Sequence, residues 1–195
     1  IRLGHNPLLR RAQSTTYTHR LTPMELNAQE RLEVGQVIEL AIGPIAHGGH
    51  FVARHNGQVI FVRHGITNEL VRIKITAVSS KIAHADVIEV LTAAPSRVNP
   101  PCQYAGKCGG CDFQHIDLVT QRKLKAEIIK EQFMRIGKID LALLGFNLEV
   151  SEVEPSDGLH WRTRMDFAVS PAGKIGFFGA RSNEVVEITE CVIAD

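Results

Sequence analysis

Between residues 33 and 93 the chain alternates apolar and polar residues in five short runs, the pattern of half-buried strands. The runs predict strands at 37–42, 51–54, 58–63, 71–75 and 85–91. Asn56-Gly57 lies between the second and third runs, and this dipeptide favours a two-residue type I′ hairpin turn. Five short strands in about 60 residues predict a small closed barrel of the OB type rather than a sandwich.

The spacing of apolar residues changes after a proline-rich linker at residues 93–101. Asp117 is a suitable helix N-cap and Gly137 a suitable stop, and apolar residues recur between them every three or four positions. This apolar stripe consists of Val119, Ala126, Ile129, Phe133 and Ile136. We therefore predict one long helix that packs this stripe against a core and exposes its basic residues.

The last part of the chain returns to strand-like patterns. These predict strands at 161–170, 174–178 and 184–189, with a turn at Pro171-Ala172-Gly173. Neighbouring residues on a strand point to opposite faces, so one ring of the Phe177-Phe178 pair should be buried and the other exposed.

The composition is that of a globular chain, with 44% hydrophobic and 22% charged residues and no apolar run near the ~20 residues that span a bilayer. We predict an α+β fold, mainly β with one long helix. It has an OB-like barrel at 33–94 and a second unit at 101–195. That second unit holds a cysteine loop, the helix and a central β region. The arginine-bearing residues 1–32 predict a disordered extension, with a transit peptide as the alternative.

Charge is distributed unevenly along the chain. Residues 1–100 carry 11 Lys and Arg against 7 Asp and Glu, a net charge of +4. Residues 101–195 carry 11 against 14, a net charge of −3. The first half of the chain is therefore the better candidate for binding a polyanion.

Four cysteines form the strongest chemical signal. Cys102-x5-Cys108-Gly109-Gly110-Cys111 is a tight triplet, and Cys191 follows after 79 intervening residues. No secretory signal opens the sequence, so this spacing indicates metal ligation in the reducing cytoplasm rather than disulfides. Four thiolates can close a tetrahedral zinc site or hold an iron–sulfur cluster. Zinc sites usually consist of paired C-x2–4-C knuckles, so the lopsided triplet favours a cluster and leaves Zn²⁺ as the alternative.

Segment 101–115 closely resembles the iron–sulfur loop of bacterial RNA uracil-C5 methyltransferases, in which C-x5-C-x2-C and one later cysteine hold a 4Fe–4S cluster. Segment 46–63 resembles the TRAM domain of that family, an OB-like RNA-binding barrel, and 161–191 resembles its central β domain. The resemblance covers residues 33–195 and departs from the family pattern at Trp161, where tyrosine is frequent. It implies that the cluster ligands are Cys102, Cys108, Cys111 and Cys191.

The resemblance also implies a reaction, the transfer of a methyl group from S-adenosylmethionine to uracil C5 in structured rRNA or tRNA through a cysteine adduct. In the family, a catalytic domain with a Gly-rich cofactor turn follows the central domain, and we find no such turn in this sequence. Because all four cysteines are assigned to the cluster, we predict no catalytic residue here. The chain is expected to bind and position RNA and to be inactive alone. The alternative is a free-standing RNA-binding module that is stabilised by a bound zinc ion or iron–sulfur cluster and is not an enzyme. Neither reading predicts a membrane or an obligate protein partner.

Basic and aromatic side chains on the predicted strands are candidates for RNA contacts. They are Arg54, Arg63 and His64 beside the hairpin, Arg162 and Arg164 on the strand at 161–170, and Phe178. Arg162 and Arg164 should share one face of their strand, where they can hold phosphate or stack on a base. His47 and His50 are interpreted as surface or RNA-facing loop residues.

Overall fold

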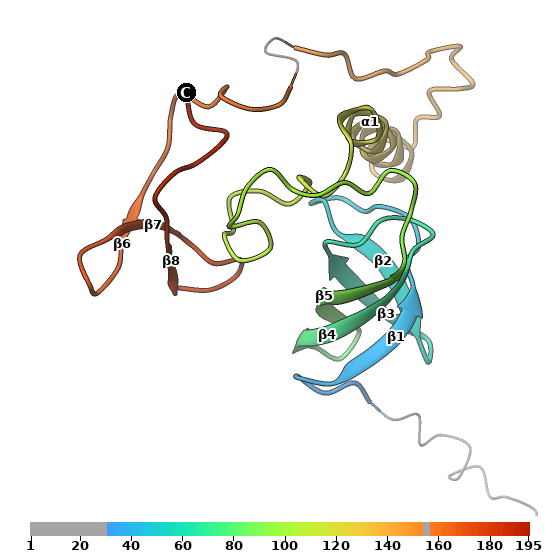
Figure 1. The fold of residues 1–195 in the computed structure, drawn as a ribbon. Helices are drawn as coiled ribbons and strands as arrows, with labels where there is room; N and C mark the ends of the chain where they lie inside the picture. The colour runs from blue at the N-terminus through green and yellow to red at the C-terminus, as the bar shows by residue number, and fades with distance from the viewer. Residues whose placement is uncertain (1–30, 154–156) are drawn as a thin grey trace, which may run out of the picture. The chain divides into compact units, whose positions relative to one another are not determined.

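The computed structural model describes residues 31–153 and 157–195, and the structural statements below concern these residues. The extension predicted at 1–32 lies, up to residue 30, outside them. The first five strands are β1 Val37–Ala41, β2 Phe51–His55, β3 Gln58–Arg63, β4 Leu70–Val78 and β5 Ile82–Thr92. They are followed by helix α1 Leu118–Arg135 and by the short strands β6 Ala168–Val169, β7 Ile175–Phe178 and β8 Val185–Glu187 (Figure 1).

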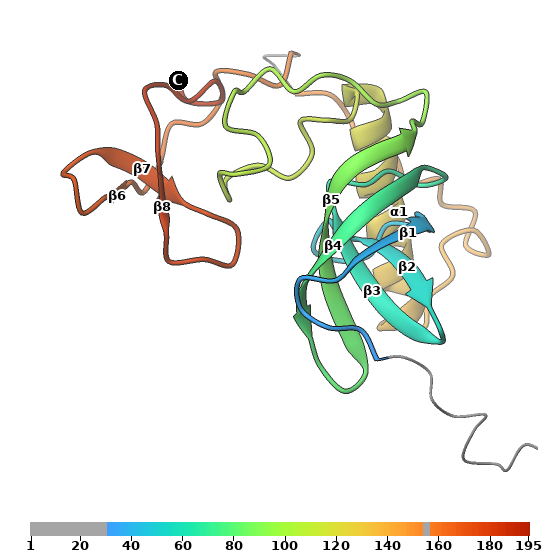
Figure 2. The ribbon, with the colours of Figure 1, turned by 60° about the horizontal axis from the view of Figure 1, so that its bottom comes forward.

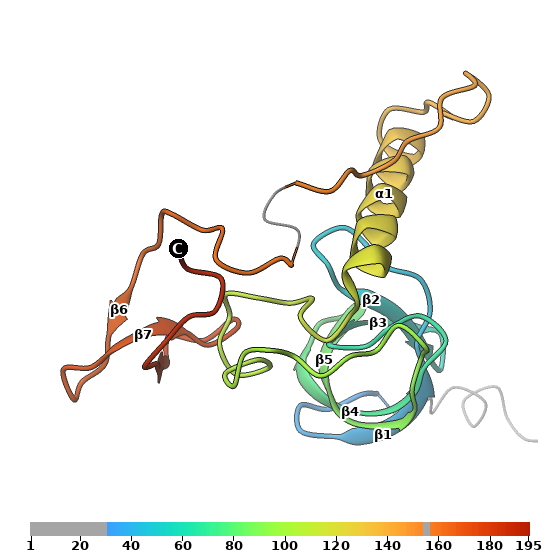
Figure 3. The same cartoon turned by 45° about the horizontal axis from the view of Figure 1, so that its top comes forward.

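The first five strands form one curled sheet in the order β1-β4-β5-β3-β2. Its pairs are antiparallel except for β3 and β5, which run parallel. The residues after β1 close the sheet onto β2, because the Gly43 amide donates to the Val52 carbonyl (2.8 Å) and the Val52 amide donates to the Pro44 carbonyl (2.9 Å). Seen along its axis the sheet forms a ring (Figure 3), which agrees with the predicted OB-like barrel.

Alternation along the strands builds the barrel core. Val71, Ile73 and Ile75 are at most 1% exposed, as their spacing predicts. In the hairpin between β2 and β3, Asn56 and Gly57 have φ angles of 47° and 80°, the left-handed values that a type I′ turn requires. The predicted turn is therefore confirmed. Strands β4 and β5 are longer than predicted, because register shifts in their ladder let them keep pairing while they curl.

Helix α1 begins where the sequence predicts, but a different face from the predicted one packs against the barrel. The Asp117 side chain caps it by accepting the Thr120 amide at 2.9 Å. Leu124 is buried and joins the barrel core. The predicted buried stripe is wrong, because the helix packs Leu124 and Ile128 against the core instead and then runs on past the end of the barrel (Figure 3). Four of its members are between 37% and 71% exposed: Val119, Ile129, Phe133 and Ile136. Among the described residues, no helical segment combines the length and the apolar composition of a membrane span.

Strands β6, β7 and β8 form a small antiparallel sheet with β7 in the middle (Figure 2). The strand predicted at 161–170 is wrong over most of its length, since only Ala168–Val169 pair in a sheet. The Trp161 and Arg162 amides instead donate to the Ile193 carbonyl, at 3.1 and 2.8 Å. Phe178 is 53% exposed, as expected for one ring of its pair, but Phe177 is only partly buried and not buried as predicted.

Candidate metal centre and nucleic-acid interface

The four cysteines line one small pocket of about 140 Å³. Cys102, Cys108 and Cys111 come from the loop before α1, and Cys191 comes from the segment after β8. All four thiols are free of disulfides. The fold therefore places around a single pocket the residues that the sequence assigns to one site.

Backbone contacts fold the cysteine loop tightly. The Cys108 amide donates to the Tyr104 carbonyl at 2.9 Å, which makes a turn between the first two cysteines. The Gly109 amide donates to the Phe178 carbonyl at 3.0 Å, and a Cβ at this position would lie 2.9 Å from the same oxygen. The Gly110 amide lies 3.4 Å from the Cys108 sulfur. Glycine at position 109 thus allows the end of β7 to lie beside the loop.

The Cys111 thiol lies close enough to the other three to be affected by their charge. Burial raises the pKa of the Cys111 thiol to about 11, and the neighbouring Cys191, Cys108 and Cys102 add to the increase. Thiolates are the form that binds metals, so a positively charged centre is needed to keep several of them ionised together. In the described part of the chain, no three His, Cys, Asp or Glu side chains are already arranged around one ion position.

A buried ion pair ties the barrel to the linker that precedes the cysteine loop. The Glu69 carboxylate is 0% exposed and accepts the Ile66 amide (2.9 Å), the Ala94 amide (3.1 Å) and two N–H groups of Arg97 (2.6 and 2.7 Å). Arg97 also donates to the His64 carbonyl at 2.7 Å. Burial opposes ionisation of Glu69, but these hydrogen bonds hold its pKa below the ordinary 4.5.

A second set of contacts attaches the cysteine loop itself. Arg63 is only 8% exposed, and its guanidinium donates to the Asp112 carboxylate at 3.1 Å. The side chain of His115, 5% exposed, lies 3.2 Å from the Gly65 carbonyl. His64 is partly buried, and burial, followed by the charge of Arg63, lowers its pKa. Arg63 therefore holds the loop on the barrel, and its side chain is not offered to a ligand.

Four of the residues predicted to contact RNA are exposed: Arg54, Arg162, Arg164 and Phe178. Arg162 and Arg164 do not share a strand face, because their segment is not paired in a sheet. The Arg162 side chain instead donates to the Arg164 carbonyl at 3.2 Å and lines the cysteine pocket. Arg162 therefore lies at the cysteine pocket and not on the strand face that its alternation with Arg164 predicted.

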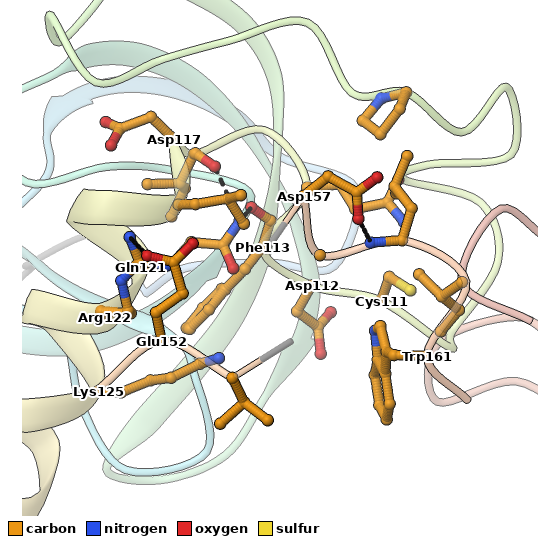
Figure 4. Close-up of a pocket in the computed structure, with 18 of the residues that line it drawn as sticks. Cys111, Asp112, Phe113, Asp117, Gln121, Arg122, Lys125, Glu152, Asp157 and Trp161 are labelled. Atoms are coloured by element: carbon orange, nitrogen blue, oxygen red, sulfur yellow. Dashed lines mark hydrogen bonds and ion pairs between the residues drawn. The ribbon is translucent and has the colours of Figure 1, made fainter. Parts of the chain in front are cut away.

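A larger pocket of about 860 Å³ is lined by the cysteine loop, the start of α1 and parts of the segment 150–162 (Figure 4). Charges of both signs line it, and Arg122 lies 3.7 Å from Glu152. The carboxylates are Asp112, Asp117, Glu152 and Asp157, and the cations are Arg122, Lys125 and Arg162. This mixture gives the pocket no preference for an anionic ligand, so we assign it no function.

Three aromatic rings form a cluster on the outside of the barrel that the sequence did not predict. Phe61 on β3 and His84 on β5 are register partners, and their rings stack with centroids 5.6 Å apart and 26° between planes. His50 stands at 76° to Phe61 and 68° to His84. The available signal was Phe61 itself, an aromatic residue at an outward position between the buried Ile60 and Val62.

Comparison with known proteins finds a domain match and several similar proteins, all of them named RNA methyltransferases. Residues 31–88 match the TRAM domain. Over 83% of its length the chain is 41% identical to an RNA methyltransferase of Streptomyces avermitilis and 37% identical to one of Bdellovibrio bacteriovorus. Over 80% of its length it is 34% identical to the 23S rRNA (uracil(1939)-C(5))-methyltransferase RlmD of Chromohalobacter salexigens. The chain spans 32–40% of the length of these relatives.

A solved structure has the same fold over most of the chain. It is the tRNA (uracil-54, C5)-methyltransferase of Pyrococcus abyssi in complex with S-adenosyl-L-homocysteine, with a TM-score of 0.50 and 24% identity. The match covers 80% of this chain and 33% of that one. At this identity the likeness supports the fold alone.

Proposed function

The chain carries a TRAM domain and is related to RNA methyltransferases over 83% of its length, and from this premise we propose that it is the RNA-binding part of an RNA uracil-C5 methyltransferase. The whole enzyme would transfer a methyl group from S-adenosylmethionine to uracil C5 of a uridine in rRNA or tRNA. The observation that carries the proposal is the similarity to RlmD, which extends over 161 residues and so reaches well beyond the TRAM domain.

The exposed basic residues and Phe178 are the proposed RNA surface. Arg54 lies on β2 of the barrel, and in OB folds this strand and its neighbour are the usual nucleic-acid face. Arg162 and Arg164 would contact phosphate, and the exposed Phe178 ring would stack on a base. Contacts of this kind hold folded RNA in position without carrying out chemistry, which is the role we assign to this part of the enzyme.

The four cysteines are the proposed ligands of a 4Fe–4S cluster. They offer an all-sulfur donor set around one pocket, the kind of donor set that holds iron–sulfur clusters. The amide of Gly110 beside Cys108 is the kind of donor that stabilises charge on a cluster sulfur. When bound, the cluster would cross-link the loop before α1 to the segment after β8.

RNA binding by the purified chain tests the proposal. We expect binding of a fluorescently labelled rRNA or tRNA fragment that weakens steeply as salt rises, because its contacts would be mostly to phosphate. Arg164→Ala, at an exposed arginine outside the cysteine pocket, should weaken binding and lower the slope of log affinity against log salt by about one. Lys123→Ala on the exposed face of α1 is the matched control and should have little effect. Absence of RNA binding even at low salt, by folded protein, would refute the proposal.

A further inference from the structure

The ring cluster of His50, Phe61 and His84 has the composition of a base-stacking surface. All three side chains are partly exposed, so they are accessible from outside the barrel. Two rings are nearly parallel and the third stands almost perpendicular to both. The Nδ1 atom of His84 is buried and has no hydrogen-bond partner among the described residues. Aromatic faces on the strands of an OB fold are the usual platforms for unpaired bases.

A cation lies at the edge of these rings. The guanidinium of Arg181, from the connection between β7 and β8, lies 3.2 Å from Nε2 of His50. Arg181 is exposed and has a φ of 52°, a left-handed backbone conformation that is uncommon for arginine. Burial, and next the charge of Arg181, lowers the pKa of both His50 and His84. The two imidazoles are therefore neutral rings near pH 7, while the positive charge resides on Arg181.

Resting on the proposed RNA-binding function, we propose that His50, Phe61 and His84 bind one unpaired base of the RNA by stacking, and that Arg181 contacts a neighbouring phosphate. A base within an RNA helix is stacked on both faces, so this surface selects loops and single strands. The stack of Phe61 on His84 spans two strands of the rigid barrel, which holds the platform in place before RNA arrives.

Two labelled RNAs of the same length, about 12 nucleotides, test the site directly. One carries ordinary bases and the other is abasic at every position, so that both have the same phosphates but only the first offers a base. We expect the wild-type chain to bind the first about tenfold more tightly, a difference of ~1.4 kcal/mol that lies within the range for one base on an aromatic ring. Equal affinity for the two RNAs would overturn the stacking site without requiring any variant to fold.

Variants then assign the effect to the rings. Phe61→Leu keeps an apolar side chain but removes the aromatic face, so it should abolish the tenfold preference and leave binding of the abasic RNA unchanged. Phe146→Leu makes the same replacement at a 57% exposed ring outside the barrel and should change neither affinity. Arg181→Gln should weaken both RNAs alike, because both keep their phosphates. Equal behaviour of Phe61→Leu and Phe146→Leu would refute the site, whereas binding of neither RNA by the wild type would refute the RNA-binding function on which it rests.

Discussion

Replacing Glu69 by alanine should destabilise the chain more than any surface change in the barrel. The carboxylate is fully buried and accepts four hydrogen bonds, two of them from Arg97, whose side chain is 20% exposed. Glu69→Ala leaves two backbone amides unpaired and a largely buried guanidinium without its carboxylate, with only the hydrogen bond to the His64 carbonyl remaining. Removing one partner of a buried pair costs about 3–5 kcal/mol, a large share of the ~5–15 kcal/mol that stabilises a typical domain. The melting temperature should fall by roughly 6–20 °C for a chain of this size.

Thermal and urea unfolding, followed by circular dichroism, measure this cost. The matched control is Glu39→Gln, which breaks the exposed ion pair with Arg72 and should cost less than about 1 kcal/mol. Because the pKa of folded Glu69 lies below 4.5, its stabilising contribution is complete above that pH and is lost as the pH falls through the folded pKa. The difference in free energy of unfolding between the wild type and Glu69→Gln should therefore become smaller below pH 4.5. If Glu69→Ala costs no more than Glu39→Gln, the buried network does not stabilise the fold as we infer.

Three further predictions concern the cysteine pocket and its neighbours. Cys191→Ser should lower iron content and melting temperature together in anaerobically purified protein, since ligation would close a loop of about 80 residues; one zinc and no iron per chain would contradict the cluster. Burial lowers the pKa of His115 to about 4, so stability should fall as the pH drops from about 6.5 towards 4, and His115→Gln should flatten that part of the pH profile of urea unfolding. Asp117→Ala removes the cap of α1 and should cost about 1 kcal/mol in the same assay, whereas no change would show that the helix start does not depend on this contact.

Local features of the fold could be predicted because their physical causes act over a few residues. The alternation at Val71–Ile75 places every second side chain on one face of a strand, whatever the rest of the chain does. The turn at Asn56-Gly57 and the cap at Asp117 depend on backbone conformations that these residues favour. The grouping of the cysteines around one pocket could also be predicted, because three of the four lie within ten residues of one another.

Only the tertiary structure decided which of these surfaces are covered. The spacing of apolar residues in α1 predicts a buried stripe, but the barrel contacts Leu124 and Ile128 instead, and Val119 and Phe133 remain 54% and 42% exposed. The sequence predicts Arg63 to be an exposed cation, whereas the fold places Asp112, 49 positions later, beside its guanidinium. The same holds for the stack of Phe61 on His84, since the parallel pairing of β3 with β5 joins strands that are not consecutive in the chain. Such contacts depend on how distant segments come together, and the pattern of neighbouring residues carries no information about that.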